Sequence, residues 1–207
     1  MFGLYILGKM LAVMIEKQYI FPTQVFRSVY DDAEKLQKKL VSEFLAREKS
    51  DQSPVRYSAN GYTSYGSNSD ILNDPLLEDL KGFIDLCVQQ CHRETKLAGV
   101  PKLAASWFSI NRKYTYHEEH NHLPDLWSGV YYVQADQDHP GLTLVNGNQK
   151  SNWPRSGITE LSEANSPTVT CAALTGSLII FPSYLWHKVD QQMIDKERIT
   201  VAFNYGI

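Results

Sequence analysis

The sequence predicts a mainly β protein with flanking helices, in which two N-terminal helices pack on a β core. Apolar residues recur at helical spacing before about residue 100, and from Ala104 onward they alternate as they do in strands. Short strand-like runs separated by turn signals are typical of a β sandwich or barrel. A length of 207 residues favours a single domain, 1–207, with a helical part and loop at 16–100 and the β core at 101–207.

Two helices are expected in the first half. Asp31 or Asp32 can cap a helix that runs to about Arg47, because apolar side chains then line one of its faces. Asp74-Pro75 provides an N-cap followed by proline at the first helical position, and apolar residues at helical spacing continue the second helix. The stretch between the helices, Ser50–Asn73, is rich in Ser, Asn, Gly and Tyr and is expected to form a loop.

Strands are expected throughout the second half. In the first of them Trp107, Ser109 and Asn111 share one face, because side chains alternate along a strand. The segment Asn146–Pro167 is long enough to form a lid or a substrate loop. The expected strands are Ala104–Asn111, Ser128–Gln134, Gly141–Val145, Thr168–Ala173, Ser177–Phe181 and Arg198–Tyr205.

The charge balance disfavours one class of function. The chain has 20 Lys and Arg against 23 Asp and Glu, a formal net charge of −3, so no general cationic field is available to hold nucleic acid. Hydrophobic residues make up 43% of the chain, which is enough to exclude disorder for most of it. We therefore expect an ordered protein that does not bind nucleic acid.

Cysteine usage and the N-terminus indicate a cytoplasmic protein without membrane association. Three cysteines cannot form a paired disulfide framework, so reduced thiols are expected. Met1–Ile15 is apolar but interrupted by Lys9; it is too short to span a bilayer and lacks the features of a signal peptide. One hypothesis is that Met14 is the natural start; the alternative is an ordinary first strand or helix packed on the domain.

The histidines suggest a metal site. His120 and His122 point to the same side of an extended segment, where two imidazoles can hold one metal ion. Such a pair alone is weak evidence, but a glycine, an apolar strand and a turn precede a distal His187, an order that brings it beside the pair in a jelly roll. Arg198 opens the last strand and could clamp a carboxylate, with Thr200 on the same face. Ordinary loop positions are expected for the other candidates, His117 and His139.

The motifs together resemble a known superfamily. They are Trp107 with Asn111, His120 with His122, Ser128–Tyr132, Phe181–Ser183, His187, and Arg198 with Ala202–Asn204. The region 107–204 that contains them resembles the Fe(II)- and 2-oxoglutarate-dependent oxygenases. It is most similar to a bacterial and phage group of uncharacterised oxygenases with an H-x-H motif and a prolyl 4-hydroxylase-like core.

The resemblance implies a double-stranded β-helix of the jelly-roll, cupin-like type, and a set of ligands. His120, His122 and His187 would bind Fe(II), although His122 stands where the superfamily usually has a carboxylate. Asp125, Glu118 and Glu119 are the nearby alternatives for that third ligand.

The resemblance also implies the co-substrates. 2-Oxoglutarate and O2 would be consumed, with release of succinate and CO2 and with ascorbate as an optional cofactor. The residues implied to bind 2-oxoglutarate are Arg198, Thr200, Tyr132 and Asn111. Two of these positions have other interpretations from the sequence, because Tyr132 could belong to the core and Asn111 could cap a turn. Arg198 could likewise form a surface ion pair.

Three functions of different classes follow. The first is an oxygenase that hydroxylates a small-molecule or peptidyl substrate, whose identity the sequence leaves open together with the oligomeric state. The second is a three-histidine cupin-type dioxygenase that does not use 2-oxoglutarate. The third is a non-catalytic jelly-roll binding module. Arg198 discriminates between the first two, because only the first needs a guanidinium beside the metal.

Overall fold

The computed structural model describes residues 4–6, 9–11, 15–18, 20–52, 60–147, 157–162 and 165–207. Strands β1 (Leu4–Ile6) and β2 (Lys9–Leu11) pair with each other as an antiparallel ladder. Met1 and Met14 lie outside the described residues, as does much of the segment proposed as a lid, 146–167. Within the described part of the chain, no helix combines the length and the apolarity needed to cross a membrane.

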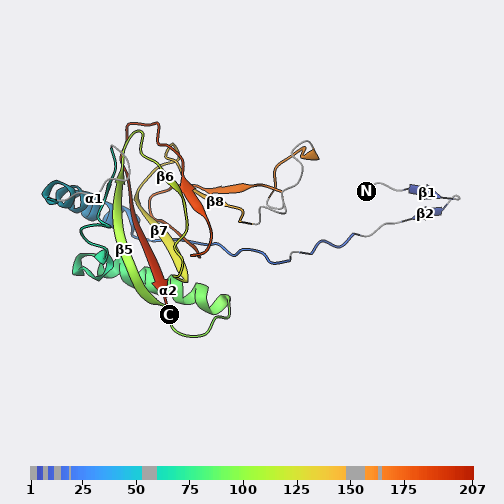
Figure 1. Ribbon diagram of the computed structural model, residues 1–207, viewed down its shortest axis with the longest axis horizontal. Coiled ribbons are helices and arrows are strands. Elements are labelled where there is room, and N and C mark those ends of the chain that lie inside the picture. Colours follow the sequence, from blue (N-terminus) through green and yellow to red (C-terminus); the bar gives the residue numbers. More distant parts are fainter. Residues whose placement is uncertain are drawn as a thin grey trace.

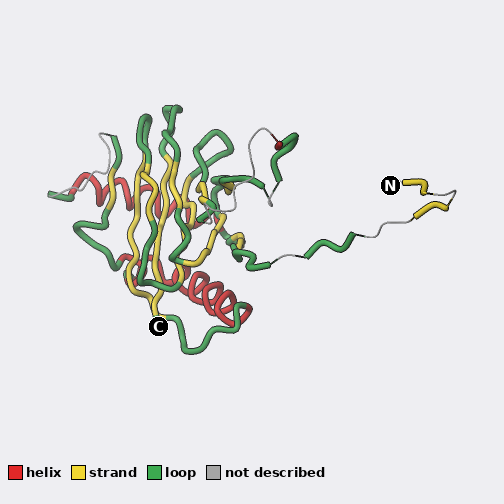
Figure 2. The backbone as a smooth tube through the Cα atoms, turned by 45° about the vertical axis from the view of Figure 1, so that its right-hand side comes forward, coloured by secondary structure: helices red, strands yellow, loops and turns green. Residues whose placement is uncertain are grey.

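Two antiparallel sheets form the body of the protein, as Figures 1 and 2 show. The six-stranded sheet has the order β3 (Phe26–Val29), β10 (Ser177–Pro182), β7 (Trp127–Gln134), β12 (Arg198–Gly206), β5 (Lys102–Asn111) and β4 (Tyr62–Thr63). The four-stranded sheet has the order β6 (His117–His120), β11 (His187–Val189), β8 (Leu142–Val145) and β9 (Thr168–Cys171). The prediction of a mainly β, antiparallel jelly roll is confirmed.

The central strands are buried on both faces, and each face belongs to a different cluster. Along β7, Tyr131 and Val133 join the cluster that includes the helices, whereas Val130 and Tyr132 join the cluster that includes β8 and β9. The same alternation holds along β10. Because side chains of a strand alternate between its faces, one face supports the helices and the other meets the second sheet.

Both helices contribute to the first of these clusters. Helix α1 (Ala33–Ser50) buries Leu36, Leu40 and Phe44, and the ring of Phe44 stacks on Phe108 of β5 at a centroid distance of 4.2 Å. Helix α2 (Glu78–Glu94) buries an apolar face with the spacing expected of an amphipathic helix. The two helices lie across the strands of the six-stranded sheet (Figure 2).

The start of α2 differs in detail from the expected cap. Asp74 does accept a hydrogen bond at Oδ1 from the backbone N–H of Leu76, at 2.8 Å. The residues that follow form a short 3-10 turn, η2 (Pro75–Leu77), before the α-helix begins at Glu78. A second 3-10 turn, η1 (Ile71–Asn73), precedes it.

Several short strands were not predicted, among them β3 and β4. Strand β4 occupies two residues of the segment 50–73, which was expected to be loop throughout, and it pairs with β5. Strand β3 forms the edge of the sheet beside β10, and its side chains are alternately half-buried and exposed. Both were missed because so short or so polar a strand carries too little hydrophobic alternation to stand out.

Candidate metal centre and adjoining cavity

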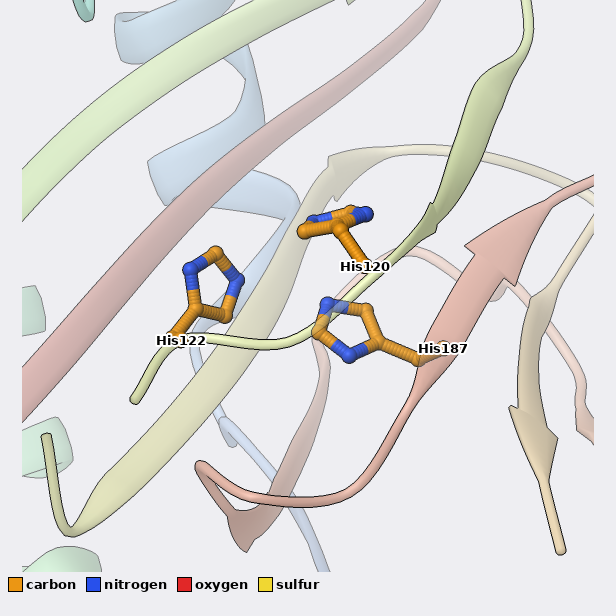
Figure 3. A group of neighbouring side chains, drawn as sticks. All are labelled: His120, His122 and His187. Carbon is orange, nitrogen blue, oxygen red and sulfur yellow. The ribbon is translucent and has the colours of Figure 1, made fainter. Parts of the chain in front are cut away.

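A cavity is lined by strands of both sheets, and three histidines that line it converge on one another (Figure 3). His120 ends β6 and pairs directly with His187, which begins β11, while His122 follows β6 in the next loop. Ring centroids lie 4.3 Å apart for His120 and His187, and 5.0 Å apart for each of the other two pairs. The potential ligand atoms all lie within 4.8 Å of one another.

Backbone hydrogen bonds determine which nitrogen of two rings can bind a metal. Nδ1 of His120 lies 2.7 Å from the carbonyl oxygen of Glu118, and Nδ1 of His187 lies 2.9 Å from that of Leu185. A carbonyl can only accept, so Nδ1 carries the proton in both rings. Nε2 is therefore left as the lone-pair nitrogen, which is the form in which a histidine binds a metal ion.

Burial keeps two of the imidazoles, those of His122 and His187, neutral. Desolvation, with a smaller contribution from the nearby His120, lowers the pKa of His122 to about 4 and that of His187 to about 3. A neutral imidazole has a free lone pair at pH 7, whereas a protonated one has none. His122 and His187 can therefore bind a cation at pH 7 without first losing a proton.

A buried polar network holds His122 in place. Its backbone N–H donates to the carbonyl oxygen of Ser183 at 2.9 Å. The hydroxyl of Ser183 lies 2.7 Å from that of Ser128, which donates to Oδ1 of Asn204 at 2.9 Å. These residues come from three of the motifs recognised in the sequence, so part of that pattern supports the loop that carries His122.

The carboxylates considered as alternatives do not join this group. Among the described residues, the cluster of potential ligands consists of the three histidines, without Asp125, Glu118 or Glu119. Glu118 and Glu119 are exposed on β6. The arrangement therefore favours His122 over these carboxylates as the third metal-binding side chain.

Arg198 is buried beside the histidines. It begins β12, it is 3% exposed, and it lines the same cavity as His120, His122 and His187. Its Nη1 donates to Oδ1 of Asn111 at 3.3 Å, while its Nε is buried without a hydrogen-bond partner among the described residues. No ion pair between described residues includes it, so the alternative of a surface ion pair is wrong.

The other predicted residues surround Arg198 in different ways. Thr200 lines the cavity two residues further along β12. Tyr132 is fully buried in the cluster between the sheets; Arg198 lies 5.2 Å from the centre of its ring, and its hydroxyl has no hydrogen-bond partner in the described part of the chain. Asn111 binds Arg198 and His117 with its side chain, so the turn-cap interpretation is wrong.

Sequence reasoning missed His117. It was expected in a loop, but it begins β6, lines the cavity, and accepts at Nε2 from Nδ2 of Asn111 at 3.1 Å. Burial, then the charges of Arg198 and His120, lower its pKa to about 3. The one available signal was its position three residues before His120, but the polar strand between them has no apolar alternation to reveal it. His139 lies in a turn, as expected, with Nδ1 against Asp136.

Comparison with known proteins agrees with this geometry. Residues 105–204, just under half of the chain, match the family model described as "Putative 2OG-Fe(II) oxygenase". No curated protein matches the sequence. Over these residues the chain is similar to the 2OG-Fe(II) oxygenases, and the cluster of His120, His122 and His187 is one that could hold a metal ion.

Solved structures share the fold at low sequence identity. A prolyl-4-hydroxylase of Pseudomonas putida has a TM-score of 0.61 at 13% identity, covering 89% of this chain and 92% of that chain. HygX of Streptomyces hygroscopicus, solved with nickel and 2-oxoglutarate bound, has a TM-score of 0.59 at 13% identity, covering 89% of this chain and 83% of that chain. The α-ketoglutarate-dependent epimerase SnoN of nogalamycin biosynthesis has a TM-score of 0.60 at 14% identity, covering 89% of this chain and 76% of that chain.

Proposed function

We propose that this protein is an Fe(II)- and 2-oxoglutarate-dependent dioxygenase that hydroxylates a small-molecule or peptidyl substrate. One observation carries the proposal: a buried guanidinium, with no acidic partner among the described residues, lies in the same cavity as three converging imidazoles. The imidazoles suit a divalent cation and the guanidinium suits an anion, and a co-substrate that is both a chelator and a carboxylate satisfies the two together.

The metal would be held by His120, His122 and His187. The fit rests on their tautomers: two of the rings donate Nδ1–H to backbone carbonyls, which leaves Nε2 for the ion. When bound, iron and 2-oxoglutarate supply an O2-consuming oxidation that releases succinate and CO2. Three neutral ligands leave the centre one negative charge short of the usual two-histidine, one-carboxylate set, which raises its affinity for anionic ligands.

The distal carboxylate of 2-oxoglutarate would bind Arg198. A buried charge without a counter-ion is costly, and a carboxylate that accepts from Nε and from the free guanidinium N–H groups removes that cost. Thr200 can donate its hydroxyl from the neighbouring position of the same face. Tyr132, whose hydroxyl is buried without a partner, and Asn111, which holds Arg198, complete the proposed binding group.

The position of Arg198 weighs against the second function, a cupin-type dioxygenase that does not use 2-oxoglutarate. That function needs the histidines but has no use for a buried guanidinium beside them. A non-catalytic module would need neither. Because SnoN is named as an epimerase, the fold supports more than one outcome, and product analysis is needed to establish hydroxylation.

Other parts of the proposal rest on the sequence. We propose a cytoplasmic enzyme of one domain, 1–207, with ascorbate as an optional cofactor and with no nucleic-acid or membrane partner; the net charge of −3 and the reduced cysteines support this. The helical part would serve as a fixed support for the β core, because Phe44 of α1 stacks on Phe108. Cell fractionation and a thermal unfolding profile with one transition would test these points.

The central test is anaerobic titration with Fe(II) and then 2-oxoglutarate. A visible charge-transfer band that requires both additions is the expected result, followed by release of succinate when O2 is admitted. The matched pair of variants is His187→Ala and His139→Ala, because these histidines are 5% and 7% exposed and only the first lies in the cluster. Iron uptake without the band would support the cupin-type function, and no iron uptake would support the binding module.

A further inference from the structure

His117 is a half-buried histidine that the proposed function does not use. It lines the cavity from the start of β6, but it is not part of the metal-binding group. Its Nε2 lies 3.1 Å from Nδ2 of Asn111, and Oδ1 of the same amide accepts from Nη1 of Arg198 at 3.3 Å. Side chains from β6, β5 and β12 are thus linked in series by hydrogen bonds, and the series ends at the guanidinium of Arg198.

These two hydrogen bonds are consistent with only one direction of donation. A guanidinium can donate but not accept, so the amide of Asn111 must turn its oxygen to Arg198 and its NH2 group to His117. His117 must then accept at Nε2, with its proton on Nδ1. Reversing the amide would place its NH2 group against the guanidinium and leave two donors facing each other. By accepting from the NH2 group, His117 therefore supports the one amide orientation in which Asn111 can accept from Arg198.

Arg198 depends on that amide for its position. Among the described residues, Asn111 is its one hydrogen-bond partner, and its other contact, the ring of Tyr132 at 5.2 Å, has little directionality. The backbone ladder pairs Arg198 with Asn111 and so fixes their Cα atoms, but an arginine side chain retains several rotatable bonds beyond that point. Holding Nη1 in advance reduces the entropy that must be lost when an anion binds.

We propose that His117 is a positioning residue for the co-substrate. By orienting the amide of Asn111, it holds Arg198 where the guanidinium meets the distal carboxylate of 2-oxoglutarate. The inference rests on the proposed function, because it assumes that Arg198 binds that carboxylate. It assigns His117 a role in co-substrate affinity and none in metal binding.

The test compares two ligands that differ at the distal end. 2-Oxoglutarate and pyruvate share the α-keto carboxylate that chelates a metal, but pyruvate has no distal carboxylate to meet Arg198. Calorimetry on the Ni(II)-loaded, full-length protein gives the affinity for each without requiring turnover. His117→Leu removes the acceptor at similar size, whereas His117→Gln keeps an acceptor oxygen for the amide of Asn111.

We expect His117→Leu to weaken 2-oxoglutarate binding at least tenfold and to leave pyruvate and Ni(II) binding within twofold of wild type. His117→Gln should retain 2-oxoglutarate affinity within threefold. The inference is wrong if His117→Leu binds 2-oxoglutarate as wild type does, if it loses both ligands equally, or if His117→Gln is as weak as His117→Leu. Failure of the wild-type protein to bind Ni(II) or 2-oxoglutarate would instead overturn the proposed function.

A double-mutant cycle keeps the inference testable if His117→Leu folds poorly. Asn111→Ala breaks the same series of hydrogen bonds at its middle, so it should also weaken 2-oxoglutarate binding selectively. Adding His117→Gln or His117→Leu to Asn111→Ala should then have no further effect on 2-oxoglutarate affinity. Additive losses would mean that His117 acts independently of Asn111, which contradicts the proposed role.

Discussion

The two faces of the six-stranded sheet differ in function although the same strands form both: one packs against the helices and the other lines the cavity. Along β12, Ile199 and Val201 belong to the cluster that includes the helices, while Arg198 and Thr200 line the cavity. The first set is wholly apolar and the second is polar and charged. A period of two therefore lets adjacent residues serve packing and ligand binding separately, and substitutions on the two faces should have separable effects.

The largest effect is expected on the helix face. Phe44→Ala should lower the free energy of unfolding by about 4 kcal/mol, because it removes a fully buried ring stacked on Phe108 and leaves a cavity. Chemical denaturation of the metal-free protein measures this loss. Metal affinity of the folded fraction should remain unchanged. A comparable loss of metal affinity would show that the two faces are not separable.

For Arg198 on the cavity face, we expect a loss of ligand affinity without a loss of stability. Arg198→Met should weaken 2-oxoglutarate binding by at least about 2 kcal/mol, or about 30-fold, because a desolvated charge pair is lost. The free energy of unfolding should stay the same or rise, because the uncompensated buried guanidinium is removed. Calorimetry and denaturation of the same variant check both parts. Unchanged 2-oxoglutarate affinity would remove Arg198 from the proposed clamp.

Acid should destabilise the metal-free protein through the cavity histidines. The folded pKa values of His117, His122 and His187 lie below the ordinary 6.5, so the unfolded chain binds more protons as the pH falls. This part of the stability is fully present above pH 6.5 and is lost as the pH falls toward the folded pKa values. Protonation of each histidine in the unfolded chain should lower the free energy of unfolding by about 1.4 kcal/mol when the pH falls from 7.5 to 5.5.

His117→Gln isolates the contribution of one histidine to that pH dependence. Urea denaturation at the two pH values should show a loss smaller by about 1.4 kcal/mol than in the wild-type protein. His139→Gln is the control for replacing a histidine that does not line the cavity. An equal loss in His117→Gln and wild type would mean that His117 titrates normally in the folded state.

The smallest of these effects is expected at the start of α2. Asp74→Ala should destabilise the protein by about 1 kcal/mol, because the carboxylate accepts from the backbone of Leu76 and pairs with Arg47 at 2.7 Å. The same contacts lower the pKa of Asp74, so its contribution is present above pH 3.8 and is lost at lower pH. Denaturation at pH 7 measures the effect, with 2-oxoglutarate affinity as the unaffected control.

Local patterns identified most of the β core. The strands that contain Phe108, Tyr131 and Val201 lie where alternation of apolar residues predicted them, because each buries a hydrophobic face. The short polar strand β6 escaped notice, and His117 with it, because four mostly charged residues give no hydrophobic signal. The roles assigned to the metal-binding and co-substrate residues remain predictions that the experiments above address.

The sequence by itself determined which side chains were available and which face of a strand each would occupy. His120, His187 and Arg198 could be named from motifs and spacing alone. Only the tertiary structure decided that β6 pairs with β11, that Arg198 is buried with no acidic partner in the described part of the chain, and that Asn111 joins it to His117. The physical reason is the sequence separation of the interacting residues. The alternation of side chains along a strand is set by neighbouring residues, whereas strand pairing and burial depend on contacts between residues far apart in the chain.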